Sequence, residues 1–207
     1  MTSAAFSHHG AKLRLREFAA DDAPDIQSLH ADPRVRALLP DTQPLHEAHW
    51  AQEFATCLGG FYRRHPGLGI WRCAVPRADA EQFAGWFSLM PVQASADTKA
   101  LGLREGDAEL GSRLKPEHWG SGLALDGGAV LLDHAFGQLG LRTVWGICHP
   151  DNRNARACLG ALGFTPRSRA PYEGQPSDYH SLDAATWFAL RTLSPRQRLR
   201  RTQHTPS

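Results

Sequence analysis

Short stretches of alternating apolar and polar residues recur along the chain and indicate strands with one buried face. In the clearest of them, Ala108, Leu110 and Leu114 alternate with more polar neighbours. The period of two sends Glu109 and Arg113 to the face opposite Leu110. Alternation, together with short runs that contain aromatic and β-branched residues, predicts seven strands, at residues 13–18, 70–75, 83–89, 108–114, 143–148, 164–167 and 182–190.

Segments with apolar residues three or four positions apart predict helices between these strands. The first begins at Asp21 or Asp22, either of which can cap it. The other helices span residues 45–64, 121–138 and 155–162, and loops are expected at 33–44, 93–106 and 168–181. The resulting order of strands and helices predicts an α/β fold with a mixed sheet and helices on both of its faces.

A chain of 207 residues suits one domain that buries a core without disulfides. We expect a flexible amino-terminal segment at residues 1–10, a single domain over residues 11–192 and a disordered basic tail at residues 193–207. The first ten residues lack the pattern of a secretion signal, and no run of eighteen apolar residues follows. These features predict a cytoplasmic protein.

The composition and net charge of the chain argue against nucleic acid and membranes as partners. Hydrophobic residues make up 42% of the chain, charged residues make up 21%, and the net charge is +2. No overall field therefore attracts nucleic acid or an anionic membrane, and we expect neither as a partner. The basic tail has no aromatic residues between its charges, which further disfavours nucleic-acid binding. The four cysteines lack C-x-x-C spacing and are expected to be free thiols.

A glycine-containing turn lies between the strand at 108–114 and the helix that follows. In the sequence Trp119-Gly120-Ser121-Gly122-Leu123-Ala124, backbone N–H groups at the start of a helix can converge on an anion. A dinucleotide-binding fingerprint would need a third glycine at Leu125, so that motif fails. Two readings stay open, a phosphate-binding turn and a pair of glycines that only permit a tight turn.

Blocks on both sides of this turn resemble the RimJ/RimL-like branch of the GNAT acetyltransferases. The blocks are Glu109-Leu110-Gly111, Pro116, Trp119 to Ala124, Ala135-Phe136, Leu139-Gly140-Leu141, Asp151-Asn152 and Leu162-Gly163-Phe164. Looser resemblance at residues 13–16, 32–35, 85–89 and 183–190 extends it over nearly the whole domain.

The resemblance implies a GNAT-type α/β fold, with a mixed, mostly antiparallel central sheet of about seven strands flanked by helices on both faces. It also implies acetyl-CoA as co-substrate. No metal is expected, because His118, His134 and His149 are not at a metal-ligand spacing. The pantetheine arm would pair with the strand backbone near Arg113 and Leu114, and Asn152 would bind the pantetheine region, cap the next helix, or do both. The pyrophosphate would lie on the N–H groups of Trp119, Gly120, Ser121, Gly122, Leu123 and Ala124.

Acetyl transfer requires a neutral amine, a polarised carbonyl and a thiolate that can leave. Glu109 is the candidate base for the amine proton, and its alternative role is that of a surface carboxylate. Where this branch usually has serine, three residues after the asparagine, the chain has Ala155. Tyr172 or Tyr179 could supply the acid instead. Alternatively, no acid is needed, because a thiol with a pKa of about 8.5 is already a fair leaving group.

The expected acceptor is a primary amine, either a protein N-terminus or a small molecule. Deprotonating a lysine at pH 7 costs about 4–5 kcal/mol, whereas an α-amine costs about 1–1.5 kcal/mol, which suits a site with one modest base. We therefore expect an acetyl-CoA-dependent N-acetyltransferase that works by direct attack on the thioester, as a monomer or homodimer. The alternative is a catalytically weak acyl-CoA-binding domain, which the absence of a serine at Ala155 favours.

Overall fold

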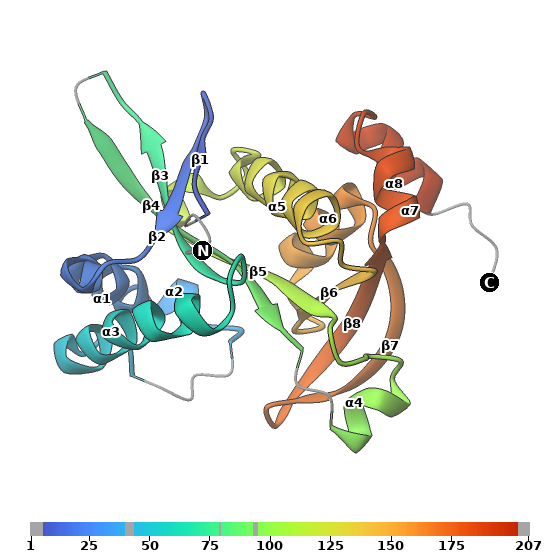
Figure 1. Ribbon diagram of the computed structural model, residues 1–207, viewed down its shortest axis with the longest axis horizontal. Helices are drawn as coiled ribbons and strands as arrows, with labels where there is room; N and C mark the ends of the chain where they lie inside the picture. Colours follow the sequence, from blue (N-terminus) through green and yellow to red (C-terminus); the bar gives the residue numbers. More distant parts are fainter. Residues whose placement is uncertain (1–5, 40–43, 79, 93–94, 203–207) are drawn as a thin grey trace. The chain divides into compact units, whose positions relative to one another are not determined.

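The computed structural model describes residues 6–39, 44–78, 80–92 and 95–202 (Figure 1). The strands in these ranges are β1 (His8–His9), β2 (Arg14–Glu17), β3 (Gly69–Pro76), β4 (Glu81–Pro91), β5 (Ala108–Leu114), β6 (Thr143–Cys148), β7 (Thr165–Tyr172) and β8 (Gln175–Asp183). They form one sheet in the order β1-β2-β3-β4-β5-β6-β8-β7. The sheet is mostly antiparallel, and β5 and β6 pair in parallel. The predicted α/β fold is confirmed, with eight strands instead of about seven.

The chain divides into two compact units. The first consists of Met1–Ser88 and Ser112–Gly127, and the second consists of Leu89–Gly111 and Gly128–Ser207. Strands β4 and β5, together with helix α5 (Leu123–Asp133), contribute residues to both units.

In the first unit, helix α1 (Ala23–Ala31) packs against helix α3 (Ala48–Arg64). Both helices are amphipathic, and α1 buries Ile26 and Leu29 completely. The hydroxyl of Tyr62 on α3 accepts a hydrogen bond from the Phe18 amide at 3.0 Å and donates one to the Ile70 carbonyl. Tyr62 thus ties α3 to the chain on either side of the helical pair.

Two glycines allow close packing around β4 in the same unit. Gly85 has φ 132°, and a Cβ atom there would lie 2.1 Å from the carbonyl oxygen of Arg113. A Cβ at Gly127 on α5 would lie 2.2 Å from the ring of Phe87. A side chain at Gly85 would therefore push β4 away from β5, and a side chain at Gly127 would push α5 away from β4. Strand β5 and helix α5 are the two elements that border the glycine turn.

In the second unit, the two faces of β6 are covered differently. Leu159 of helix α6 (Arg153–Leu162) packs against Gly146, where a Cβ would lie 2.4 Å from a leucine methyl. Trp145 points to the other face, because successive strand residues alternate. It forms a buried cluster there with Leu103 and Tyr179. The segment between β4 and β5 therefore supplies part of this core.

The structure corrects the prediction for residues 164–190. Strands β7 and β8 form one long antiparallel hairpin, closed by Glu173 and Gly174 at φ 48° and 78°, where a loop was expected. Residues 184–190 form helix α7 (Ala184–Leu190) instead of a strand. The Asp183 side chain caps this helix by accepting from the Thr186 amide at 2.8 Å. The strand prediction was wrong because this apolar segment begins at a helix cap.

The structure also differs from the sequence expectations in two loops. Helix α2 (Pro33–Arg36) lies within the expected break at 33–44 and is capped by Asp32, which accepts from the Arg34 amide at 2.9 Å. Helix α4 (Ala96–Ala100) lies in the expected loop at 93–106, where Ser95 and Thr98 form reciprocal capping hydrogen bonds. Residues 40–43 and 93–94 lie outside the described residues.

Both ends of the chain contain elements that the sequence analysis did not predict. Strand β1 lies in the amino-terminal segment, and helix α8 (Pro195–Thr202) lies in the tail expected to be disordered. The Arg198 side chain is buried and donates to the carbonyls of Leu190, Arg191 and Leu193, which satisfies acceptors at the end of α7. Residues 1–5 and 203–207 lie outside the described part of the chain.

Candidate active site

The glycine turn connects β5 to α5 through a short 3-10 helix, Pro116–His118. Gly120 and Gly122 have φ 73° and 86°, a conformation that L side chains rarely adopt. Between them, the Ser121 hydroxyl donates to the His118 carbonyl at 2.6 Å and accepts from the Leu123 amide at 3.3 Å. The backbone conformation of both glycines is therefore required by the turn itself.

The turn has the features of an anion site. Within the described residues, the amides of Gly120, Gly122 and Ala124 have no protein acceptor, and the α-helical bonds of α5 begin only with the Asp126 amide. A Cβ at Gly120 or Gly122 would meet nothing within 4 Å, so the space beside the turn is open. Unpaired amides at the positive end of a helix suit the oxygens of a diphosphate.

The neighbouring candidates Arg113 and Leu114 are engaged within the same unit. The Trp119 indole, 45% exposed, donates to the Leu114 carbonyl at 2.8 Å. The Arg113 guanidinium lies 5.0 Å from the centre of the Trp86 ring and 3.3 Å from Nε2 of His30. The Arg113 side chain is thus engaged by Trp86 and His30, and the Leu114 carbonyl is engaged by Trp119.

Asn152 lies in the second unit, at the start of α6. Its side-chain oxygen accepts from the Ala155 amide at 3.0 Å, so it caps the helix. The side-chain NH₂ group takes no part in that bond, which leaves a donor for a ligand. Ala155, at the position where the family branch usually has serine, contributes its amide to the cap and has no hydroxyl.

Glu109 lies on β5, in the same unit as Tyr172 and Tyr179, and the hairpin brings Tyr172 to it. The Tyr172 hydroxyl donates to Oε2 of Glu109 at 3.2 Å. Burial raises the pKa of Glu109 to about 7, the hydrogen bond from Tyr172 opposes that rise, and the nearby Glu173 adds to it. A carboxyl with this pKa can accept a proton near neutral pH, as a general base requires.

The two tyrosines differ in their surroundings. The Tyr179 side chain is 1% exposed, packs with Trp145, and donates to the Pro171 carbonyl at 3.3 Å. Burial raises the pKa of Tyr172, and the negative charge of Glu109 raises it further. Tyr172 is therefore the tyrosine placed to act on Glu109, whereas Tyr179 is held within the core.

The sequence analysis did not identify Asp107 and Trp145 as a pair. The Trp145 indole donates to Oδ2 of Asp107 at 2.8 Å, and Trp145 is the partner of Glu109 in the parallel ladder. The pair fixes a large side chain beside the candidate base. An aspartate immediately before a strand and a tryptophan in a buried strand were visible in the sequence, but their pairing depends on the register of β5 and β6.

Neither a metal-binding cluster nor a membrane-spanning helix occurs among the described residues. No group of three histidine, cysteine, aspartate or glutamate side chains in this part of the chain could hold a metal ion. None of the helices in the described ranges is long and apolar enough to cross a membrane.

Comparison with known families matches the acetyltransferase (GNAT) domain to residues 12–165. The chain belongs to the GNAT acetyltransferase family. The matched segment includes Glu109, the glycine turn and Asn152, whereas Tyr172 and Tyr179 lie beyond its end.

Among curated proteins, the chain is similar to the FsC-acetyl coenzyme A-N(2)-transacetylase of Aspergillus fumigatus. The two are 31% identical over 157 residues, which cover 76% of this chain and 64% of that protein. The match thus spans less than two thirds of the relative's length.

Solved structures of acetyltransferases share the fold. RimJ of Mycobacterium smegmatis, in complex with CoA-disulfide, aligns with a TM-score of 0.69 at 19% identity over 92% of this chain and 89% of its own. The ribosomal-protein-S5-alanine acetyltransferase of Vibrio fischeri aligns with a TM-score of 0.70 at 16% identity, over 88% and 98% respectively. These similarities support the GNAT fold class expected from the sequence.

Proposed function

We propose that the protein transfers an acetyl group from acetyl-CoA to a primary amine. The observation that carries this proposal is the set of unpaired amides at Gly120, Gly122 and Ala124, in a chain of the GNAT family. These amides would hold the diphosphate, and the β5 backbone near Leu114 would orient the pantetheine arm. The cofactor, when bound, supplies an acetyl group activated as a thioester.

Glu109 would accept the proton that the amine loses as its nitrogen attacks. With a pKa raised to about 7, the carboxyl is about half ionised at neutral pH and is basic enough to help. Tyr172 would hold the carboxylate in position through its hydrogen bond to Oε2. The proton thus moves from the nitrogen to Glu109, directly or through one water molecule, and then to solvent.

The acceptor is proposed to be an α-amine or another amine of low basicity. The Vibrio fischeri structure is named for an alanine of a ribosomal protein, and the Aspergillus fumigatus relative is named for a nitrogen of FsC. Neither name assigns the acceptor of this chain. An amine of low basicity suits a site that has one base and no hydroxyl at Ala155, because such an amine needs less help to lose its proton.

A catalytically weak acyl-CoA-binding domain is the second candidate. Two observations favour it. The Tyr172 hydroxyl already donates to Glu109, and Ala155 has no hydroxyl. No evident acid is therefore left to protonate the departing sulfur. The two functions share the cofactor site and differ in whether the acetyl group leaves.

An assay of free CoA release, with acetyl-CoA and a panel of peptides and small amines, tests the proposal. We expect amine-dependent release that falls at least about tenfold in Glu109→Gln, since a general base typically contributes more than that. Glu53→Gln, an exposed carboxyl on α3, is the matched control and should retain activity. CoA binding without release above background for any amine would favour the second candidate, and no CoA binding at all would exclude both.

A further inference from the structure

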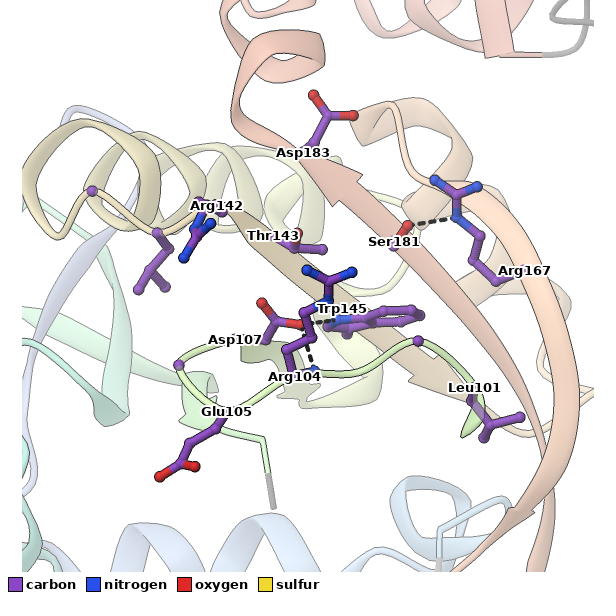
Figure 2. Close-up of a pocket in the computed structure, with 14 residues that line it drawn as sticks. Leu101, Arg104, Glu105, Asp107, Arg142, Thr143, Trp145, Arg167, Ser181 and Asp183 are labelled. Atoms are coloured by element: carbon purple, nitrogen blue, oxygen red, sulfur yellow. Dashed lines mark hydrogen bonds between the residues drawn. The ribbon is translucent and has the colours of Figure 1, made fainter. Parts of the chain in front are cut away.

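Three arginines line a cleft in the second unit that contains none of the residues proposed for acetyl transfer (Figure 2). The cleft has a volume of about 630 Å³ and lies among residues 101–107, the turn before β6, and the β7–β8 hairpin. Arg104, Arg142 and Arg167 supply its positive charges. None of the proposed cofactor or catalytic residues is among those that line it.

These arginines lack charged partners. In the described ranges, no carboxylate lies within 4 Å of the guanidinium of Arg104, Arg142 or Arg167. Arg167 donates from Nε to the uncharged Ser181 hydroxyl at 2.7 Å, which leaves its two terminal NH₂ groups for another acceptor. Three guanidinium groups without a salt bridge line the cleft, and a bound anion would give them a charged partner.

The carboxylates that line the cleft are occupied elsewhere or directed away. Asp107 is buried and accepts from the Trp145 indole at 2.8 Å and the Arg104 amide at 3.0 Å. Asp183 caps α7 through the Thr186 amide and hydroxyl. Figure 2 shows the exposed carboxylate of Glu105 pointing away from the Arg104 guanidinium.

We propose that this cleft binds a carboxylate or phosphate group through Arg104, Arg142 and Arg167. The planar guanidinium fork matches the oxygens of either group and forms charge-assisted hydrogen bonds with them. The volume suits a small molecule or a short segment of a larger one. Binding at this site does not depend on the proposed acetyl transfer.

The anion that binds in the cleft could belong to the amine acceptor or be a separate small molecule. Trp145 lines the cleft and is also the ladder partner of Glu109. An amine acceptor whose nitrogen reaches Glu109 could therefore place an acidic group in the cleft. The alternative source is a free small anion that binds independently of the acceptor.

Calorimetric titration with citrate and with inorganic pyrophosphate tests the site directly, with CoA present at saturation so that the glycine turn is filled. We expect wild-type binding that weakens as salt is added, and a loss of affinity of at least about tenfold in the double variant Arg104→Gln/Arg142→Gln. Arg77→Gln/Arg196→Gln removes two exposed arginines outside the cleft and should bind like wild type. Absence of wild-type binding, or an equal loss in both double variants, would overturn the proposal.

Two further measurements complete the test. Arg104→Lys/Arg142→Lys keeps the charges and should recover part of the affinity, and thermal unfolding of every variant shows whether the fold is intact. The second arm, which rests on the proposed function, compares KM for acidic and neutral acceptor peptides. If KM rises in Arg104→Gln/Arg142→Gln for the acidic peptides and stays unchanged for the neutral peptides, the acceptor is the source of the anion. Unchanged KM values with lost citrate binding identify a free anion.

Discussion

The Tyr172 hydroxyl donates a hydrogen bond to Oε2 of Glu109, a residue 63 positions earlier in the chain. Burial and this hydrogen bond shift the pKa of Glu109 in opposite directions. Burial favours its neutral form and raises its pKa to about 7, whereas the hydrogen bond stabilises the carboxylate and limits the rise. Burial thus sets the direction of the shift in the pKa of Glu109, and Tyr172 limits its size.

Replacing Tyr172 should move the pH dependence of catalysis. Wild-type kcat/KM is expected to fall below pH 7 as Glu109 becomes protonated, with an apparent pKa of about 7. In Tyr172→Phe the carboxylate loses its donor, so the acid limb should move upward by up to about one pH unit. A profile of kcat/KM from pH 5.5 to 9 measures this shift.

Tyr179→Phe provides the matched control for that experiment. Its hydroxyl donates to the Pro171 carbonyl and makes no hydrogen bond to Glu109, so its acid limb should coincide with that of wild type. Equal shifts in the two tyrosine variants would show that the hydrogen bond to Glu109 is not the cause.

The raised pKa also predicts that Glu109 lowers the stability of the fold as the pH rises from about 4.5 to about 7. The folded protein keeps a proton on Glu109 up to pH 7, whereas the carboxyl of the unfolded chain releases it near pH 4.5. The free energy of unfolding should therefore decline between these two values, by roughly 3 kcal/mol in total. Glu109→Gln cannot ionise and should lack this decline.

Urea unfolding at several pH values between 4.5 and 8.5 measures the difference. The stability of Glu109→Gln relative to wild type should grow from pH 4.5 to about 7 and then stay level, whereas Glu53→Gln on the exposed face of α3 should follow wild type. Parallel curves for wild type and Glu109→Gln would mean that burial does not raise the pKa of this carboxyl.

The sequence predicted those parts of the fold in which one local pattern dominates. Alternation identified β5, and the glycine turn was placed between a strand and a helix, as the structure has it. The hairpin was missed because its buried strand β8 carries polar residues, including Ser177, His180 and Ser181, on its covered positions. The Glu173-Gly174 turn was the local signal that could have revealed it.

The pairing of Glu109 with Tyr172 could not be read from the sequence. It depends on β8 inserting between β6 and β7, and on the register that pairs Ser168 with Tyr179. Periodicity predicts which face a residue occupies within its strand, but strand order decides which distant residue shares that face. The candidates in the glycine turn were easier to predict because they lie within six consecutive positions.

Substitution in the glycine turn should weaken cofactor binding by more than it weakens the fold. Gly122→Ala places a methyl group in the open space beside the unpaired amides, at φ 86°. We expect a loss of stability of roughly 1 kcal/mol from the backbone strain and a drop in CoA affinity of about tenfold or more. Gly140→Ala, at φ 65° and with equally open surroundings, should show the strain without the change in CoA affinity.

The packing of α5 on β4 should depend on the absence of a side chain at Gly127. Its Cβ would lie 2.2 Å from the Phe87 ring, so Gly127→Ala must displace either the ring or the helix, at a cost of about 1–3 kcal/mol. Gly137→Ala, in the π-helical turn His134–Gln138 that directly follows α5, has nothing within 4 Å and should be neutral or slightly stabilising. In Phe87→Leu the obstructing ring is gone, so adding Gly127→Ala should cost less than it does in wild type. A thermal-unfolding double-mutant cycle measures that coupling, and additive effects would show that the two residues do not compete for the same space.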